Sequence, residues 1–183
     1  MTVALAGRRI DAPDAAVARF PSEAVARVRA ALRALFETRG TSALVCSGAC
    51  GADLVALDVA GTLGLRRRLV LPTPPATFRA SSVVDRPDSA HDWGALFDRV
   101  VGEVASRGDL VVLDAGAGHA GYVAATDAIL DEAGRLSDGS PLAVVVWEGA
   151  ARGPDDLTAA FAEAAGARGW PVIDVPTVPH DTG

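Results

Sequence analysis

The residues best suited to chemistry form a run of small side chains, Ser47-Gly48-Ala49-Cys50-Gly51-Ala52-Asp53. The run follows a short apolar stretch at 43–46 and precedes a segment with the apolar spacing of a helix. A ligand can approach the backbone closely in such a turn, and unpaired N–H groups at the start of a helix attract anions. The run therefore predicts a phosphate-binding turn, with Ser47, Gly48, Ala49, Cys50, Gly51 and Asp53 as candidate ligand-binding residues. A turn that is small only for packing is the alternative, because one glycine-rich turn is a weak signal.

Two arginines are candidates for binding phosphate oxygens. Arg8 follows Gly7 at the end of the first apolar run, and Arg79 lies in a proline-rich segment that begins at Pro72. The planar guanidinium group can donate paired hydrogen bonds to a phosphate. A solvated arginine is the alternative in each case. Asp53 would fall in the first turn of a helix, where it would fix the turn, contact a ribose hydroxyl group or simply favour the helix dipole.

An acidic cluster follows the most apolar run, which ends at Trp147. Glu148, Asp155 and Asp156 would contact ribose hydroxyl groups, hold Mg²⁺ together with a phosphate, or transfer protons. They are the candidate catalytic residues, and solvated loop charges are the alternative. Trp147 would either pack in the core or stack on a base. No spacing of cysteine and histidine residues resembles a zinc site, so no metal-binding residues are assigned.

The elements that must position these residues alternate between strands and helices. Apolar runs predict strands at 3–6, 43–46, 68–71, 109–113, 142–147 and 172–175, and helical spacing predicts helices at 22–40, 52–63, 93–107, 122–136 and 154–168. Ser22 is the expected N-cap of the first helix, Pro154 fits the first turn of the last, and 72–91 is expected to be irregular. Continuously apolar strands are typical of a parallel sheet covered on both faces.

The expected fold class is α/β, a Rossmann-like three-layer sandwich with a mostly parallel sheet of about six strands and helices on both faces. Right-handed crossovers place every strand-to-helix loop at one edge of such a sheet. Ligands bind there, outside the carboxyl ends of the strands. The loops at 7–13, 47–53, 72–86, 114–121 and 147–156 are therefore expected to gather around one site.

The chain has 183 residues and a net charge of −6, and its 17 basic residues are all arginine. This length predicts a single domain over 1–176 with a flexible tail at 177–183. The acidic balance without a basic run argues against nucleic acid as a partner. No apolar stretch has the length of a membrane span, and the N-terminus lacks the plan of a signal peptide. We therefore expect a cytoplasmic protein, with a homodimer as an open alternative.

Several motifs occur in a recognisable order. They are Gly7-x-x-Ile10-Asp11, the run at 47–53, Leu71-Pro72 leading to Phe78-Arg79-x-Ser81-Ser82-Val83, and Val144-Val145-Val146-Trp147-Glu148-Gly149 followed by the segment 152–158. This set resembles the SLOG superfamily, which includes the DprA/Smf and LOG Rossmann-like domains. The resemblance implies a nucleotide or nucleotide-derived ligand held by the glycine turn and the late loop. It adds Gly7, Pro72, Ser81, Gly149 and Thr158 to the candidate ligand-binding residues.

The sequence departs from that family in the late loop. LOG enzymes carry a catalytic Glu three residues after the Thr of their last motif, and the position that corresponds here is Phe161. The expected function is therefore binding or sensing of a nucleotide-derived small molecule. A nucleotide hydrolase that cleaves an N-glycosidic or phosphoester bond is one alternative, and a protein-interaction domain with a vestigial pocket is the other. Mg²⁺ bound with a phosphorylated ligand is the only cofactor considered.

Overall fold

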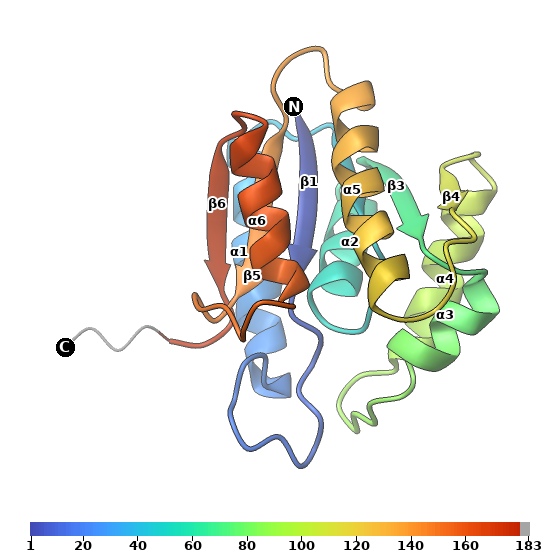
Figure 1. Cartoon of the computed structure of the whole chain (residues 1–183), viewed down its shortest axis with the longest axis vertical. Helices are drawn as coiled ribbons and strands as arrows, with labels where there is room; N and C mark the ends of the chain where they lie inside the picture. Colours follow the sequence, from blue (N-terminus) through green and yellow to red (C-terminus); the bar gives the residue numbers. More distant parts are fainter. Residues whose placement is uncertain (180–183) are drawn as a thin grey trace.

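The computed structural model describes residues 1–179, which fold around one six-stranded sheet (Figure 1). The strands are β1 (Thr2–Gly7), β2 (Ala43–Cys46), β3 (Arg66–Leu71), β4 (Leu110–Val112), β5 (Leu142–Trp147) and β6 (Val172–Pro176). Neighbouring strands are parallel throughout, in the order β4-β3-β2-β1-β5-β6. The predicted parallel α/β sheet is confirmed.

Helices cover both faces of this sheet. They are α1 (Val25–Thr38), α2 (Ala52–Thr62), α3 (Pro75–Ser82), α4 (Trp93–Ala105), α5 (His119–Leu136) and α6 (Leu157–Ala167). In Figure 1, α5 and α6 lie in front of the sheet and α1 and α2 lie behind it, while α4 packs against α2 and α3. These three layers confirm the Rossmann-like sandwich. None of the helices within residues 1–179 combines the length and the apolar character that a membrane crossing requires.

Strand β1 shows why the strands read as continuously apolar. Val3 and Leu5 belong to the core cluster under α1, α2 and α4, whereas Ala4 belongs to the cluster under α5 and α6. Successive side chains of a strand point to opposite faces, so a sheet covered on both faces needs an apolar residue at every position. The sequence pattern therefore follows from the two layers of helices.

The strand order reverses at β1. Strands β2, β3 and β4 extend away from one side of β1, and α5 then leads the chain back to β5 on the other side. The carboxyl ends of β1 and β5, at Gly7 and Trp147, therefore lie at the topological switch point. Open α/β sheets bind their ligands in the crevice at this point.

Three predicted helix starts are wrong, since α5 begins at His119 and not at Tyr122, and the starts of α1 and α6 differ as well. The 3-10 turn η1 (Ser22–Ala24) precedes α1, and the hydroxyl of Ser22 donates to Asp88 at 3.0 Å instead of capping the helix. Helix α6 begins after Pro154, because the Asp156 side chain caps it by accepting the amide N–H of Thr158 at 2.9 Å. Ser22 was misjudged because a side chain with capping ability has other partners within reach in the folded chain.

The segment at 72–91, expected to be irregular, contains helix α3. Its prolines stand at the helix start, where the missing N–H costs nothing, and Phe78 is buried with its ring centroid 6.0 Å from that of Phe97. Thr177, which the sequence placed in a flexible tail, is fully buried and its N–H donates to Trp147 O at 3.0 Å. The rest of the predicted tail beyond residue 179 lies outside the described residues.

Replacement of Gly51 by alanine should destabilise the fold. Gly51 has a φ of 109°, and an added Cβ would lie 2.6 Å from Ile10 N and 2.7 Å from Arg8 O. Backbone strain and overpacking together predict a loss of more than about 2 kcal/mol in the free energy of unfolding. Gly102→Ala is the matched control, since nothing lies near its added Cβ and the helix should gain about 0.5–1 kcal/mol. Urea unfolding measures both, and equal effects would contradict the close contact.

Candidate functional site

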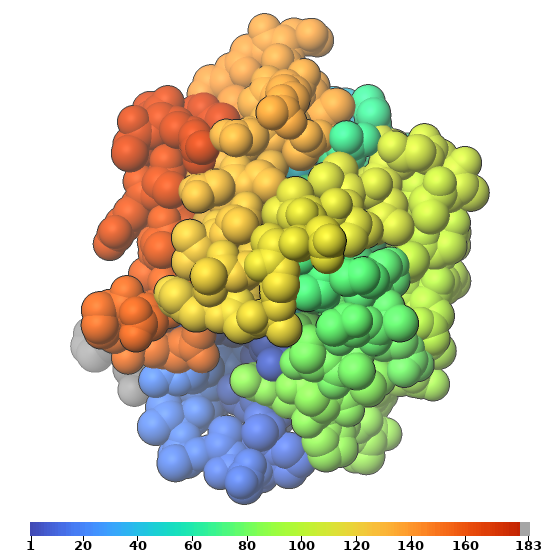
Figure 2. All heavy atoms as spheres, turned by 45° about the vertical axis from the view of Figure 1, so that its right-hand side comes forward, coloured from blue at the N-terminus to red at the C-terminus, as the bar shows by residue number. Residues whose placement is uncertain are grey.

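A cavity of about 320 Å³ opens at the carboxyl ends of β1 and β2, beside the switch point. In Figure 2 the surface is hollowed between the blue N-terminal segment, the green residues around α3 and the yellow start of α5. The cavity is lined by Leu5, Ala6, Gly7, Arg8, Arg9, Asp11, Arg19, Ser47, Ala49, Asp53, Phe78, Ser82, Arg86, Tyr122, Ala125, Thr126, Ile129, Arg152, Leu157 and Thr158. Four of the five loops expected to gather around one site contribute lining residues; the loop at 114–121 contributes none, although Tyr122 directly after it does.

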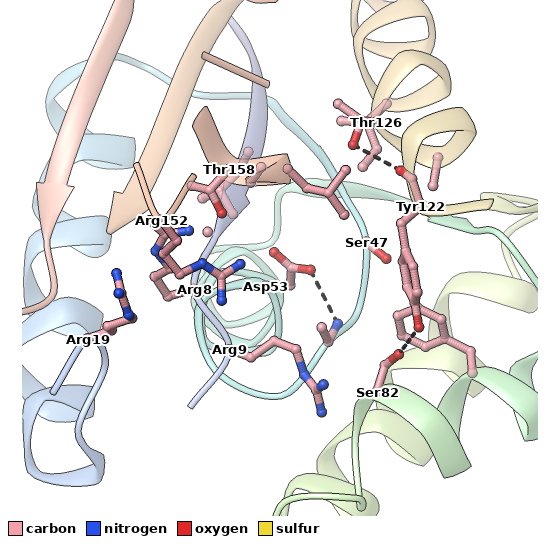
Figure 3. Close-up of a pocket in the computed structure, with 18 of the residues that line it drawn as sticks. Arg8, Arg9, Arg19, Ser47, Asp53, Ser82, Tyr122, Thr126, Arg152 and Thr158 are labelled. Atoms are coloured by element: carbon pink, nitrogen blue, oxygen red, sulfur yellow. Dashed lines mark hydrogen bonds between the residues drawn. The ribbon is translucent and has the colours of Figure 1, made fainter. Parts of the chain in front are cut away.

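The cavity has two chemically different sides (Figure 3). Arg8, Arg19 and Arg152 lie on one side, whereas Tyr122 lies on the opposite side, where its hydroxyl group is 2.6 Å from that of Ser82. The side with Tyr122 also carries the hydroxyl groups of Ser47 and Thr126, and Asp53 and Arg9 lie between the two sides. One half of a ligand would thus meet guanidinium groups, and the other half would meet an aromatic ring and hydroxyl groups.

Arg8 is the most fully bonded of these arginines. Its side chain is only 2% exposed; Nε donates to Glu148 at 2.5 Å, Nη1 to Asp156 at 2.6 Å and Nη2 to the carbonyl of Ala150 at 2.7 Å. Its guanidinium carbon lies 5.6 Å from the centre of the Trp147 ring. Arg8 was predicted to bind phosphate, but every nitrogen of its guanidinium group already donates to the protein, so its role here is to hold the site together.

The acidic cluster serves this network. Burial is the largest single effect on Asp156 and Glu148 and works against their ionisation. The hydrogen bonds and charge of Arg8, together with backbone amides and, for Glu148, Arg19, jointly outweigh it and hold the pKa of both carboxyl groups below their usual values. Arg19 also pairs with Glu148, and Asp155 is exposed. Carboxylates held in the charged form are poor proton donors near neutral pH. The two buried members of the predicted catalytic cluster are thus structural partners of Arg8 in this structure.

Asp53 differs from these carboxylates. It is 7% exposed, lines the cavity, and accepts the Ala49 N–H at 3.2 Å. Burial raises the pKa of Asp53 to about 7, against the smaller opposing effects of that hydrogen bond and of the charge on Arg9. A carboxyl group with such a pKa can exchange a proton at neutral pH. Asp53 is therefore the carboxyl group of the cavity best suited to acid–base chemistry.

Three amides of the predicted phosphate-binding turn, those of Ala49, Cys50 and Ala52, already donate hydrogen bonds within the protein. The N–H of Cys50 donates to Ser82 O at 3.0 Å, and that of Ala52 donates to Arg8 O at 3.0 Å. A Cβ on Gly48 would lie 3.2 Å from both Leu69 and Phe97, so the core fills the space beside this glycine. The small residues of the turn thus serve packing against the protein itself, which is the alternative that the sequence left open.

The structure brings together only part of the predicted set. Gly7, Arg8, Ser47, Ala49, Asp53 and Thr158 line the cavity, whereas Gly48, Cys50, Gly51, Pro72, Arg79, Ser81, Trp147, Glu148, Gly149, Asp155 and Asp156 are not among its lining residues. Arg79 pairs with Asp98 at 2.8 Å on the exposed face of α3 and α4. Because α3 is helical, it turns Arg79 away from the cavity and presents Phe78 and Ser82 to it instead.

Sequence reasoning missed several lining residues, namely Arg9, Arg19, Arg86, Tyr122, Thr126 and Arg152. Arg9, Arg86 and Arg152 belong to loops that the strand order predicted at this edge, and Tyr122 adjoins one, whereas Arg19 and Thr126 lie outside these loops. Among residues 1–179 no cluster of three or more histidine, cysteine, aspartate or glutamate side chains could hold a metal ion.

No protein-family model matches the chain, and no curated protein matches it. The resemblance to the SLOG superfamily therefore stays a prediction from its motifs.

Asp53→Asn should change how stability depends on pH. The folded-state pKa of about 7 lies above the ordinary value of 3.8 for an aspartate, so the folded state binds the proton more tightly. Ionisation of Asp53 then costs the wild type stability as pH rises from about 4 to 7, by up to about 4 kcal/mol. The variant lacks this cost, so its stability relative to the wild type should increase over that range. Urea unfolding at pH 4.5 and 7.5 measures it, with the exposed Asp155→Asn as control; a pH-independent difference would refute the burial argument.

Arg8→Gln should cost about 3–5 kcal/mol in the free energy of unfolding, because it removes the buried cation that Glu148 and Asp156 share. Arg79→Gln removes an exposed ion pair and should cost about 1 kcal/mol or less. Chemical unfolding of both variants at pH 7 compares them. Similar losses would mean that the Arg8 network is no more important than a surface pair.

Proposed function

We propose that the protein binds or senses a nucleotide or nucleotide-derived small molecule in this cavity. The observation that carries the proposal is the two-sided cavity at the switch point, with guanidinium groups opposite an aromatic and hydroxyl-bearing wall. Its volume of about 320 Å³ falls within the range of small-molecule sites. The switch point of a parallel α/β sheet is where such ligands bind in other proteins of this architecture.

The wall around Tyr122 suits the base and ribose of such a ligand. Tyr122, Phe78, Ala125 and Ile129 offer apolar and aromatic surface, and Ser82 and Thr126 add hydroxyl groups. An aromatic ring can stack on a base of any identity, while hydroxyl groups can both donate and accept hydrogen bonds. In this proposal the protein is cytoplasmic, as expected from the sequence.

Hydrolysis of the same ligand is the second candidate, and Asp53 favours it. Cleavage of an N-glycosidic or phosphoester bond by water needs a group that takes a proton from the attacking water. Asp53 has a pKa of about 7 and lines the cavity, whereas Glu148 and Asp156 are bound to Arg8. Turnover of AMP, NAD or ADP-ribose that is lost in Asp53→Asn and retained in Asp155→Asn would support this candidate over binding alone.

Mass spectrometry of the natively purified protein tests the proposed function, since a bound nucleotide should be released on denaturation. Calorimetry with AMP, NAD and ADP-ribose should then give saturable binding. Tyr122→Ala should weaken that binding by about tenfold or more through loss of stacking. Tyr122→Phe keeps the ring and removes only the hydroxyl contact with Ser82, so it should bind nearly as well as the wild type. No binding of any of these ligands to the folded protein would refute the proposal.

A further inference from the structure

Three further arginines line the cavity, namely Arg9, Arg86 and Arg152, and the last two are poorly neutralised. Arg86 forms no ion pair with any residue in 1–179; its Nη1 donates to the carbonyl of Ile10 at 2.6 Å. The guanidinium Nε of Arg152 lies 3.5 Å from Asp156, a carboxylate that already accepts a hydrogen bond from Arg8 at 2.6 Å. Arg9 pairs with Asp85 near the surface.

These three guanidinium groups also repel one another. Burial lowers the pKa of Arg86, and the positive charge of Arg9 lowers it further; Cys50 and Asp85 oppose this shift, and the charge of Arg152 adds a smaller effect in the lowering direction. Arg9 in the segment after β1 and Arg152 in the loop before α6 therefore both act on the charge of Arg86 in the loop after α3, and all three arginines line the same cavity. A folded protein keeps such an arrangement at a cost in stability, which an anion between the groups would remove.

The other charged groups of the cavity do not neutralise this cluster. Glu148 forms ion pairs with Arg8 and Arg19, and Asp156 forms one with Arg8. Asp11 directs one carboxylate oxygen to the backbone N–H groups of Arg19 and Phe20, at 2.9 and 3.0 Å. Asp53 is partly protonated at neutral pH because burial raises its pKa to about 7.

We infer that Arg9, Arg86 and Arg152 form an anion subsite for a phosphate-type oxyanion that carries two negative charges. The inference rests on the proposed function and deepens it, because it assigns the phosphate end of the ligand to this side of the cavity. The planar guanidinium group donates to two oxygens of such an anion at once. The backbone amides of the turn before α2 contribute little, since those of Ala49, Cys50 and Ala52 already donate within the protein.

Calorimetry with inorganic pyrophosphate tests the subsite without depending on any base or sugar. Pyrophosphate should bind the wild type, and its affinity should fall as salt is raised from low to physiological ionic strength. Arg152→Gln and Arg86→Gln should each weaken binding by about tenfold to a hundredfold. Arg86→Gln also removes the hydrogen bond to the carbonyl of Ile10 and can disturb the loop that carries Arg86. Arg152 is exposed, so Arg152→Gln should leave the fold intact and tests the subsite independently. Arg79→Gln, which removes a guanidinium group outside the cavity, should bind like the wild type.

Adenosine and AMP separate the subsite from the proposed function. AMP should lose affinity in Arg152→Gln and Arg86→Gln, while adenosine should be affected little because it lacks the anion. If pyrophosphate does not bind, or binds equally well to the wild type and both variants, the subsite is refuted. If adenosine or AMP still binds, and this binding depends on Tyr122, the proposed function stands without the subsite. If neither ligand binds, the subsite and the proposed function are both refuted.

Discussion

The buried guanidinium group of Arg8 is the interaction on which this edge of the protein depends. Arg8 follows β1 directly, Glu148 follows β5, and Asp156 caps α6, so one side chain ties together the elements that meet at the switch point. Two carboxylates and a carbonyl satisfy the buried charge, which would otherwise be costly to remove from water. The wall of the cavity is rigid on this side because its charges are bound to each other.

That network also decides which groups remain for a ligand. The segment after β1 crosses the start of α2, where Gly51 allows the two backbones to meet and where amides that would have suited a phosphate donate to the protein. Positive charge for a ligand therefore has to come from side chains at the rim, and Arg86 and Arg152 are the least neutralised of these. In the proposed site, guanidinium groups rather than backbone amides would therefore meet the anion.

Two carboxyl groups near the same edge show how strongly the surroundings set their behaviour. Asp156 meets a guanidinium group and amide donors, which favour its charged form, whereas Asp53 has one amide donor and no ion pair among residues 1–179. Both are buried, so burial alone does not distinguish them. The two residues differ in the number and charge of their hydrogen-bond donors. This difference separates Asp156, a carboxylate that holds the fold, from Asp53, which can exchange a proton.

The alternation of apolar runs and helical spacing determined the sandwich, its parallel sheet and the edge at which the loops gather, because these follow from local periodicity and from the handedness of crossovers. The sequence did not predict helix α3, because prolines at its start are typical of irregular segments and its Phe78 packs on Phe97, which lies in another helix. The roles of Arg8, Arg79 and Arg86 were decided by the tertiary structure alone. An arginine binds the carboxylates that the fold brings to it, and partners more than a hundred residues away, such as Glu148 for Arg8, have no signature in the local sequence.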